Sequence, residues 1–373
     1  MAEFSATECA YMAQALRIAK RGLYTAHPNP MVGCVLVNDG AVVGEGWHEF
    51  AGEPHAEVNA LRAAGKDARG ATAYVTLEPC VHHGKTPPCT DALIEAGIAE
   101  VVAGLEDPNP AVSGSGFDAL AAADISVRKG LMQDSVQSLL TGFISRVTRG
   151  RPYVRLKMAS SIDGCIAMAN GQSQWITGPE ARADVQRLRA RSGAIITGIG
   201  TVLADDPAFT VREESIDTRG KQPLRVVLDS GLRMPSSAAM LALPGTTLVY
   251  CCNDGKRQAL GDAGAEIIVV DSDDGGVDLP QVLEDLAARG VNDVLVEAGP
   301  KLAGKLIEAD LVDELVIYQA PHIMGSQTMG MFHTPTWQDL TDRRALHITD
   351  VRKVGGDTRI TAQFASAFMS SLG

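Results

Sequence analysis

Two long runs in which strand-like and helix-like segments alternate constrain the fold of this chain most strongly. In residues 31–104 the segments MVGCVLV, AVVGEGW, TAYVTL and AEVVAG have the apolar patterns of strands, and HAEVNALRAAG and TDALIEAG have helical periodicity. Residues 153–321 alternate in the same way, with strand-like segments such as YVRLKMA and DVLVEA and helical ones such as GPKLAGKLIEAD. Such alternation predicts α/β domains, in which helices pack on a sheet.

Local signals predict the limits of several elements. A first helix is expected over TECAYMAQALRIAKRG, with Thr7 as its N-cap, and Asp39-Gly40 predicts a hairpin. QDSVQSLLTGFISRVTRG is expected to form one amphipathic helix, and REESIDTRGKQP and DSDDGG to form loops. The 373-residue length fits two domains, and Gly150 and Pro152 punctuate the chain between them. We therefore expect domains at residues 1–149 and 150–373.

Composition limits the partners. Lys and Arg number 33 against 45 Asp and Glu, a net charge of −12, which disfavours nucleic acid because its binding depends on cations that neutralise phosphates. Apolar runs stay short of the roughly 18 residues of a membrane span, and the first residues lack a signal-peptide pattern. The seven scattered cysteines do not suggest a disulfide framework. A cytoplasmic enzyme with a small substrate is expected.

A compact set of potential metal ligands lies in the first half. His55 and Glu57 stand at the start of a predicted helix, Cys80 follows a predicted strand, and Cys89 opens the next helix. One imidazole and two thiolates are protein ligands of an open catalytic zinc site, which keeps a fourth position for water. Positions two apart on a helix do not share a face, so Glu57 is poorly placed as a fourth ligand but can transfer protons. The pattern predicts hydrolytic deamination.

The cysteine spacing leaves an alternative open. The general zinc-deaminase pattern has two residues between its cysteines, whereas eight, VHHGKTPP, separate Cys80 from Cys89. A closed structural zinc site with Cys34 as its fourth ligand is the competing interpretation.

The motifs resemble those of one enzyme family over nearly the whole chain. They are, in order, HPNPMVGCVLV, AGEPHAE, TLEPCVHHGKTPPC, EDPNP, KMASSIDG, SQWITG, GTVLADDPAFTVR, VVLDS and VEAGPKLAG. This set resembles the bifunctional riboflavin-biosynthesis deaminase/reductases. The resemblance implies a cytidine-deaminase-like first domain and a dihydrofolate-reductase-like second one, with one Zn2+ per chain, NADPH and self-association into a homo-oligomer.

The same resemblance implies two consecutive reactions. The first domain would deaminate 2,5-diamino-6-ribosylamino-4(3H)-pyrimidinone 5′-phosphate, with His55, Cys80 and Cys89 holding zinc and Glu57 moving the proton. The second would reduce the ribosyl group to ribityl with NADPH.

Further deaminase residues follow from matching motif positions. They imply substrate contacts for Asn29, His82 and Lys85, and the charge of Lys85 suits the 5′-phosphate. His83 receives no role. Asp107 and Asn109 either border the substrate or simply form an Asp-Pro-Asn turn.

The second half is less legible without the resemblance. GIGTVL has Leu203 where a dinucleotide fingerprint would have its third glycine, so an ordinary Rossmann site is not supported. A strand ending at Glu297 and a helix beginning near Pro300 would place backbone N–H groups where they favour a phosphate, unless this is a plain turn.

The resemblance assigns the remaining reductase positions. Lys157 would orient or protonate the sugar oxygen. The substrate positions are Ser173, Arg189, Phe209 (where the family commonly has Leu), Arg212 and Glu297. The NADPH positions are Ala159, Trp175, Thr201, Asp205, Ser230, Gly299, Pro300, Lys301, Leu302, Ala303, Gly304 and Lys305.

Two rival classes remain at this point. One is a free-nucleoside or nucleic-acid zinc deaminase with an accessory domain, against which the acidic balance argues in its nucleic-acid form. The other is a non-catalytic scaffold stabilised by zinc.

Overall fold

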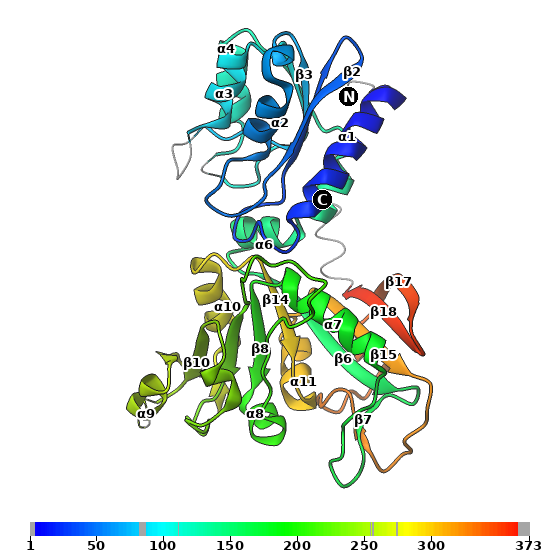
Figure 1. The fold of residues 1–373 in the computed structure, drawn as a ribbon. Helices are drawn as coiled ribbons and strands as arrows, with labels where there is room; N and C mark the ends of the chain where they lie inside the picture. Colours follow the sequence, from blue (N-terminus) through cyan, green and yellow to red (C-terminus); the bar gives the residue numbers. More distant parts are fainter. Residues whose placement is uncertain are drawn as a thin grey trace. The chain divides into compact units, whose positions relative to one another are not determined.

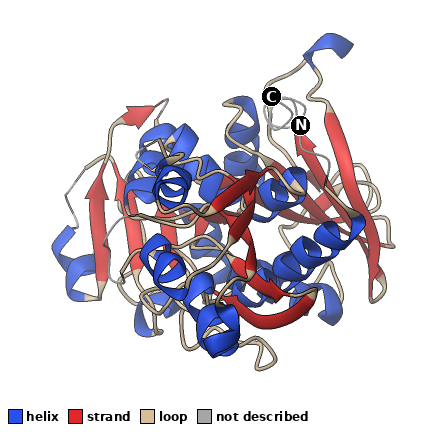
Figure 2. Cartoon of the chain, turned by 90° about the horizontal axis from the view of Figure 1, so that it is seen from above, coloured by secondary structure: helices blue, strands red, loops and turns tan. Residues whose placement is uncertain are grey.

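The computed structural model describes residues 4–364 except 82–86, 111, 254, 256 and 274. The chain divides into two compact units, Met1–Arg151 and Pro152–Gly373 (Figure 1). Each unit has its own large sheet. Figure 2 shows helices in blue beside the strands in red. No helix within the described ranges is long and apolar enough to cross a membrane.

The first unit contains a five-stranded sheet in the order β2-β1-β3-β4-β5. β1 is antiparallel to β2 and β3, whereas β3, β4 and β5 are parallel. The strands are β1 (Gly33–Asn38), β2 (Ala41–Trp47), β3 (Thr72–Leu77), β4 (Glu100–Leu105) and β5 (Ser126–Lys129). The helices are α1 (Ala6–Ala19), η1 (Lys20–Gly22), α2 (Ala56–Ala64), η2 (Gly65–Ala68), α3 (Cys89–Ala96), α4 (Ser115–Ala122), α5 (Gln133–Leu139) and α6 (Thr141–Arg149). Because β3 and β4 run in parallel, the loops that follow them leave the same edge of the sheet.

Glycines in β2 allow α2 to lie directly on the sheet. A Cβ atom at Gly46 would stand 2.2 Å from the carbonyl oxygen of Ala56, and one at Gly44 would stand 2.4 Å from that of Ala60. Real side chains do not approach a backbone so closely, so only glycine fits at these positions. The close contact fixes where α2 begins, and therefore where His55 and Glu57 lie.

Two local predictions in this unit are wrong. The N-cap of α1 is Ser5 rather than Thr7: the Ser5 hydroxyl accepts from the Glu8 N–H and the Glu8 carboxylate accepts from the Ser5 N–H, a reciprocal capping box. The expected single helix after residue 132 is two helices, since the chain leaves helical geometry at Leu140. The predicted hairpin at Asp39-Gly40 is confirmed.

The second unit contains a nine-stranded sheet in the order β11-β10-β9-β8-β14-β6-β15-β18-β17. Its strands are β6 (Tyr153–Ser161), β8 (Ala194–Gly198), β9 (Leu224–Leu228), β10 (Thr247–Cys251), β11 (Ala265–Val269), β14 (Asp293–Glu297), β15 (Glu314–Ala320), β17 (Leu346–Val354) and β18 (Asp357–Phe364). The strands from β11 to β15 in this order are mutually parallel, and the last two add antiparallel pairs.

Helices and short strands complete this unit. The helices are α7 (Pro179–Arg191), α8 (Ile199–Asp205), η3 (Ala239–Ala242), α9 (Arg257–Asp262), α10 (Leu279–Ala288), α11 (Pro300–Glu308) and η4 (Leu340–Asp342). β7 (Cys165–Ala167) pairs with β16 (Met329–Gly330). The segment DSDDGG, expected as a loop, contributes to the small β12 (Ser272–Asp273) and β13 (Gly276–Val277) pair.

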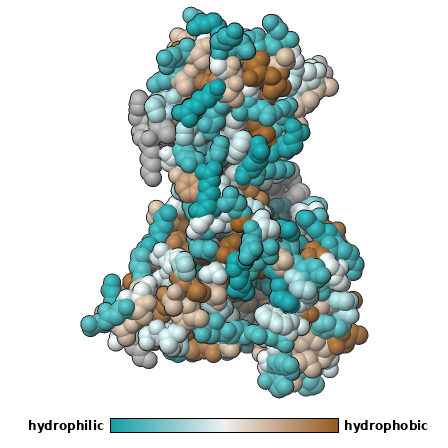
Figure 3. All heavy atoms as spheres, in the orientation of Figure 1, coloured by the Kyte–Doolittle hydropathy of each residue, from teal (hydrophilic) through white to brown (hydrophobic). Residues whose placement is uncertain are grey.

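Apolar side chains cover both faces of the second sheet. Along β8, Ala194 and Ile196 belong to one buried cluster while Ile195 belongs to another. A parallel sheet covered on both faces reads as continuous apolar runs, which explains why its strands are readily found in the sequence. On the outer face drawn in Figure 3, hydrophilic and hydrophobic residues are interspersed over both units.

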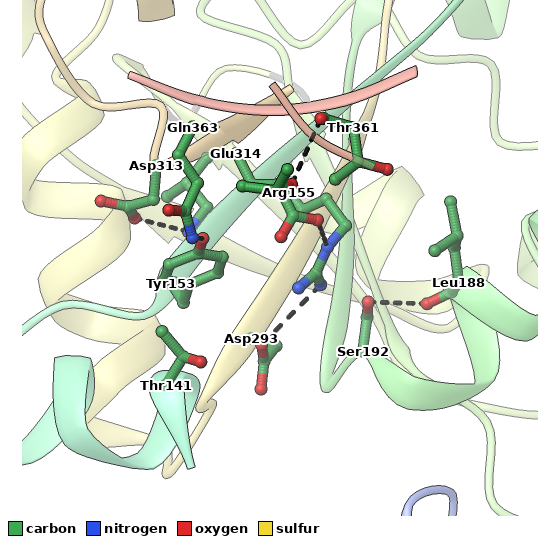
Figure 4. A network of polar contacts seen from close by, with 12 residues as sticks. Thr141, Tyr153, Arg155, Leu188, Ser192, Asp293, Asp313, Glu314, Thr361 and Gln363 are labelled. Carbon is green, nitrogen blue, oxygen red and sulfur yellow. Dashed lines mark hydrogen bonds and ion pairs between the residues drawn. The ribbon is translucent and has the colours of Figure 1, made fainter. Parts of the chain in front are cut away.

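A buried cation stands near one end of β6. Arg155 is 2% exposed and its Nε donates to Glu314, while its Nη1 lies 3.8 Å from Asp293 Oδ1 (Figure 4). Burial acts to raise the pKa of Glu314, but Arg155, together with Arg191 and Arg359, lowers it overall. A buried charge is tolerated only where such partners meet it, so these three residues hold β6, β14 and β15 together.

Candidate active sites

Three potential zinc ligands converge in the first unit. The ligand atoms of His55, Cys80 and Cys89 all lie within 4.8 Å of one another. His55 Nδ1 is 3.3 Å from Cys89 Sγ and 3.6 Å from Cys80 Sγ, so the same ring nitrogen faces both sulfurs. The fold thus brings together the three residues predicted as ligands.

Each of the three residues is placed by the end of an element. His55 is the N-cap of α2, Cys80 lies three residues beyond β3, and Cys89 is the first residue of α3. The Cys89 backbone N–H donates to Cys80 Sγ at 3.4 Å. The start of α3 therefore provides one thiol and a hydrogen bond to the other.

Electrostatics favour one thiolate in this group. Hydrogen bonding from Cys89 and then from His55 lowers the pKa of Cys80 to about 4. The pKa of the Cys89 thiol is raised by its contact with the Cys80 thiolate and by burial. Contact with Cys80 raises the pKa of His55. A bound dication would favour the thiolate form of both cysteines, because it binds both sulfurs as thiolates.

Glu57 is a buried carboxylate beside the three ligands. It is 3% exposed, and burial followed by the negative charge of Cys80 raises its pKa to about 7. It stands two residues after His55 and outside the group of three ligand atoms, as the helical spacing predicted. The site thus pairs a metal-ligand set with a carboxylate that can exchange protons.

These groups open into a cavity of about 420 Å³. The predicted substrate residue Asn29 lines it, and its Nδ2 is 3.0 Å from Nε2 of the buried His48. Asp107 and Asn109 also line it, and the Asn109 N–H donates to Asp107 Oδ1 at 2.8 Å. The predicted turn therefore forms, and both of its residues also line the cavity. The predicted residues His82 and Lys85 lie outside the described part of the chain.

Sequence reasoning missed several lining residues. They are His48, Glu53, Glu78, Phe143 and Arg146, among others. His48 ends the GWH segment after β2, and Glu78 directly precedes the Pro-Cys pair, so proximity to known motifs could have indicated both. Phe143 and Arg146 come from α6, far along the sequence, and only the fold brings them here.

The competing closed site with Cys34 is not formed. Cys34 is a fully buried residue of β1 and does not belong to the group of converging ligand atoms. Burial and then the charge of Glu57 raise the pKa of its thiol, which disfavours the thiolate that zinc would need.

In the second unit, charged residues gather where parallel strands end. Lys157 on β6 is paired in register with Glu297 on β14. Arg189 of α7 grips Glu297 with two hydrogen bonds, Nε to Oε1 at 2.6 Å and Nη2 to Oε2 at 3.1 Å. Burial lowers the pKa of Lys157, and Glu297 partly offsets this. The charge of Arg212, like those of Arg189 and Lys157, lowers the pKa of Glu297. Three cations therefore act on one carboxylate, and the net positive charge suits an anion.

Two of the other predicted substrate residues, Phe209 and Arg212, contact α7. Phe209 is buried with its ring 5.4 Å from the Arg189 guanidinium. Ser173 is half-buried in the segment that precedes α7. Arg212 is exposed, and its backbone N–H donates to Gln186 of α7 at 3.1 Å.

Two helices begin at this edge with glycine N-caps. Gly198 precedes α8 after β8, and Gly299 precedes α11 after β14, and neither carries a side-chain cap. β8 and β14 are adjacent, and a Cβ at Gly198 would lie 3.7 Å from Leu302. Pro300 occupies the first turn of α11, as predicted. The uncapped N–H groups of a helix start suit a phosphate.

The predicted NADPH residues lie on several different elements and differ in their exposure to solvent. Lys301 is exposed in the first turn of α11, whereas Ala303 and Gly304 are buried, and a Cβ at Gly304 would stand 2.0 Å from the His333 carbonyl oxygen. Asp205 ends α8 and accepts from Gln174 Nε2 at 3.2 Å. The rest are Ala159 on β6, exposed Trp175 in the segment before α7, Thr201 in α8, Ser230 after β9, Leu302 and Lys305.

Comparison with known proteins covers both units. Residues 5–105 match the family model "Cytidine and deoxycytidylate deaminase zinc-binding region", and residues 152–359 match "RibD C-terminal domain". The riboflavin biosynthesis protein RibD of Escherichia coli (strain K12) is 48% identical over 356 residues, or 93% of this chain and 96% of that protein. The chain belongs to the RibD family.

Other members of the RibD family agree in sequence and structure. RibD of Haemophilus influenzae is 42% identical over 97% of this chain and 98% of its own length. The structure of Acinetobacter baumannii RibD superposes with a TM-score of 0.90 at 44% identity, covering 96% of this chain and 99% of that one. A deaminase/reductase from Thermotoga maritima does so with a TM-score of 0.84 at 34% identity, covering 96% and 99%.

Membership of the RibD family settles the class of function. The chain is a bifunctional riboflavin-biosynthesis enzyme, with a cytidine-deaminase-like zinc-binding domain followed by a reductase domain. The rival interpretations, a deaminase with an unrelated accessory domain and a non-catalytic scaffold, do not account for matches to both halves.

Proposed function

We propose that this chain deaminates 2,5-diamino-6-ribosylamino-4(3H)-pyrimidinone 5′-phosphate in residues 1–149 and reduces the ribosyl group of the product to ribityl, with NADPH, in residues 150–373. The observation that carries the proposal is the convergence of His55, Cys80 and Cys89 beside the buried Glu57 in a cavity of about 420 Å³. The similarity to the Thermotoga maritima protein, which is named as a diaminohydroxyphosphoribosylaminopyrimidine deaminase and 5-amino-6-(5-phosphoribosylamino)uracil reductase, supports the choice of substrates.

The ligand set fits one zinc ion per chain. One imidazole and two thiols within 4.8 Å match the donors that zinc prefers at a catalytic site with three protein ligands. The Cys89 N–H bond to Cys80 Sγ orients that ligand and stabilises its thiolate form. When bound, zinc supplies a Lewis acid that lowers the pKa of water to near neutrality.

Glu57 is the residue that we assign to proton transfer. Hydrolytic deamination joins a water oxygen to a ring carbon and breaks the bond from that carbon to the amino nitrogen. Glu57 takes a proton from the attacking water and delivers it to the departing nitrogen, which leaves as ammonia. A buried carboxylate that lines the cavity is suited to this task, because it lies beside the ligand atoms and is shielded from solvent.

The cavity wall would hold the pyrimidine ring and the ribose 5′-phosphate of the substrate. Asn29, Asp107 and Asn109 offer both donors and acceptors to the ring substituents. We also propose His82 and Lys85, between Cys80 and Cys89, as substrate contacts, as predicted from the sequence.

The charged cluster of the second unit would act on the sugar phosphate. Reduction of a ribosyl to a ribityl group adds a hydride at the anomeric carbon and a proton at the ring oxygen, as the bond between these two atoms breaks. Lys157, with its burial-lowered pKa, is the residue we assign to that oxygen. Arg189 and Arg212 would bind the phosphate, and Glu297, Ser173 and Phe209 would hold the sugar.

The helix starts at Gly198 and Gly299 fit the phosphates of NADPH. They lie at the carboxyl ends of adjacent parallel strands, where open sheets bind ligands. Lys301 adds a cation and the glycines let the ligand approach the backbone. When bound, NADPH supplies the hydride. The predicted contacts at Ala159, Trp175, Thr201, Asp205, Ser230 and residues 299–305 belong to this proposal.

We also propose that the enzyme self-associates and acts in the cytoplasm. β17 is an edge strand on which Leu346, Ile348 and Val351 are 43%, 57% and 59% exposed, which favours pairing with another copy. The cytoplasm keeps the Cys80 and Cys89 thiols reduced.

The substrate assignment is tested by offering alternatives to the zinc-loaded protein. We expect rapid ammonia release from the diaminopyrimidinone ribosyl phosphate, and release at least about a hundredfold slower from cytidine or deoxycytidylate. Equal rates on cytidine would contradict the assignment.

A further inference from the structure

Glu78 is a buried carboxylate in the wall of the deaminase cavity. It is 4% exposed and accepts hydrogen bonds from three backbone N–H groups: Gly116 at 2.7 Å, Asp107 at 2.9 Å and Gly114 at 3.1 Å. Each of its two oxygens accepts at least one of these bonds. A buried carboxylate normally needs a cation, and here backbone dipoles take that place.

The three donors belong to the loop that follows β4 and to the helix after it. Gly114 is the N-cap of α4 and has no side chain to cap the helix, and Gly116 lies in its first turn. The carboxylate of Glu78, the residue that follows β3, supplies the missing cap, and its charge suits the helix start. Glu78 thereby fixes the beginning of α4 and the beginning of the loop, at Asp107, together.

The first turn of α4 approaches Glu78 too closely for any residue other than glycine at position 116. A Cβ there would stand 2.1 Å from the Pro79 carbonyl oxygen and 3.0 Å from the Glu78 side chain. The Glu78 N–H also donates to the Leu105 carbonyl at 2.9 Å, which joins the ends of β3 and β4. The segment 78–80, which ends in the predicted ligand Cys80, is thus packed directly against the loop.

That loop carries the side chains that border the cavity. The Asn109 N–H donates to Asp107 Oδ1, and the Asn109 carbonyl accepts from the N–H groups of Val112 and Ser113, each at 2.9 Å. The turn is therefore rigid within itself, and Glu78 anchors it to the rest of the site at Asp107.

We propose that Glu78 is a positioning residue for deamination, which sets Asp107 and Asn109 at a defined distance from the metal ligand Cys80. The proposal rests on the deaminase function proposed above. Glu78 acts through the loop, since backbone N–H groups occupy its oxygens. A glutamine at this position keeps the size but replaces one acceptor oxygen with an amino group, which would face an N–H donor and break at least one of the three bonds.

The test compares the zinc-loaded full-length protein with Glu78→Gln. We expect KM for the diaminopyrimidinone ribosyl phosphate to rise enough to lower kcat/KM about ten- to a hundredfold, because a small displacement of a binding group has effects of this size. Zinc content and NADPH-dependent reduction of the deaminated product should stay unchanged. Glu78→Asp, which keeps the charge but is one methylene shorter, should give a smaller effect in the same direction.

Glu106→Gln is the matched control. Glu106 is a neighbouring carboxylate on the same loop, but its side chain is 37% exposed and bonds Lys129 and Ser113 instead of the backbone. We expect KM in this variant to change less than about twofold.

Two further readouts separate positioning from a general structural role. If Glu78 acts through Asn109, the double variant Glu78→Gln, Asn109→Ala should have a kcat/KM no lower than the worse single variant. Hydrogen exchange in Glu78→Gln should accelerate at the amides of Asp107, Gly114 and Gly116 but not in β3 or β4.

The outcomes distinguish this inference from the proposed function. If the wild-type protein releases no ammonia, the deaminase proposal fails, and exchange at the three amides still decides whether Glu78 holds the loop. Wild-type KM in Glu78→Gln, unchanged exchange, or additive effects with Asn109→Ala would each overturn the positioning role.

Discussion

The two units build their sites from different materials. In the first, a histidine, two cysteines and a buried glutamate converge from the stretch between His55 and Cys89. In the second, Lys157, Arg189 and Glu297 meet near the ends of parallel strands. Lysine, arginine and glutamate are common residues, and none of them indicates a site by its type alone. Rare residue types reveal a site in the sequence, whereas common charged residues become a site only once the sheet brings them together.

The difference also separates the chemistry. The first site relies on a metal and one proton carrier, so single changes there should be nearly all-or-none. The second distributes binding over several charges and helix starts, so single changes there should be graded. The predictions below run from the largest expected effect to the smallest.

Loss of the metal should have the largest effect. In His55→Ala, or after chelation of the wild-type protein, ammonia release should fall to the uncatalysed level, since no other described group takes the ligand's place. Reduction of the deaminated product should continue at the wild-type rate. Metal analysis together with both assays checks this. Cys34→Ser is the control and should retain its zinc, and a lost metal there would revive the closed site.

Glu57→Gln should be almost as damaging while leaving the metal in place. The amide is nearly isosteric but cannot carry the proton, so kcat for deamination should fall about 10²- to 10⁴-fold. Zinc content and thermal unfolding should match the wild type. Turnover within a factor of two of the wild type would remove Glu57 from the proposed role.

Lys157→Met should impair only the second reaction. We expect kcat for reduction to fall at least about a hundredfold, with ammonia release unchanged. Single-turnover oxidation of NADPH measures this. If KM alone increases, Lys157 binds the substrate without assisting the chemistry.

The pH profile of reduction should report the same lysine. Burial lowers the pKa of Lys157, and the protonated form is present only below that pKa. Reductase kcat should therefore decline as pH rises through a value below the ordinary lysine range near 10.5. Lys157→Arg, which stays protonated, should lose this decline even if its kcat is reduced. An identical alkaline limb in both proteins would assign the titration to another group.

Lys301→Ala should have the smallest effect. Lys301 is an exposed residue of the first turn of α11, so its loss should raise KM for NADPH about three- to tenfold. KM for NADH should change less, if the lysine meets the additional phosphate. Lys353→Ala, an exposed lysine on β17, is the control and should change neither. Equal increases for both cofactors would contradict that role for Lys301.

The sequence predicted the first site more completely than the second for physical reasons. His55, Cys80, Cys89 and Glu57 were identified from residue type and spacing, because few other arrangements use such residues. The role of Glu78 could not be predicted, because its partners are backbone N–H groups that no sequence pattern indicates. The resemblance predicts a substrate contact for Arg189 and another for Glu297. The structure shows that these two side chains also form hydrogen bonds with each other, which the sequence did not indicate.

The fold shows a similar division. Strands of the parallel sheet were located correctly, because burial on both faces makes them continuous apolar runs. The N-cap of α1 was misplaced by two residues because Ser5 and Thr7 are both good caps, and only the reciprocal bond with Glu8 decides between them. The break at Leu140 was missed because Leu140 itself is neither glycine nor proline, and Gly142 two residues later lies inside α6.

One measurement tests the central claim that two complementary sites act in sequence. The zinc-loaded protein is incubated with the diaminopyrimidinone ribosyl phosphate, with and without NADPH, while ammonia and nicotinamide absorbance are followed together. We expect ammonia in both cases and NADPH oxidation that lags behind it, with Glu57→Gln abolishing both signals and Lys157→Met only the second. Oxidation of NADPH in Glu57→Gln at the wild-type rate would contradict the order, and ammonia without any oxidation would contradict the reductase assignment.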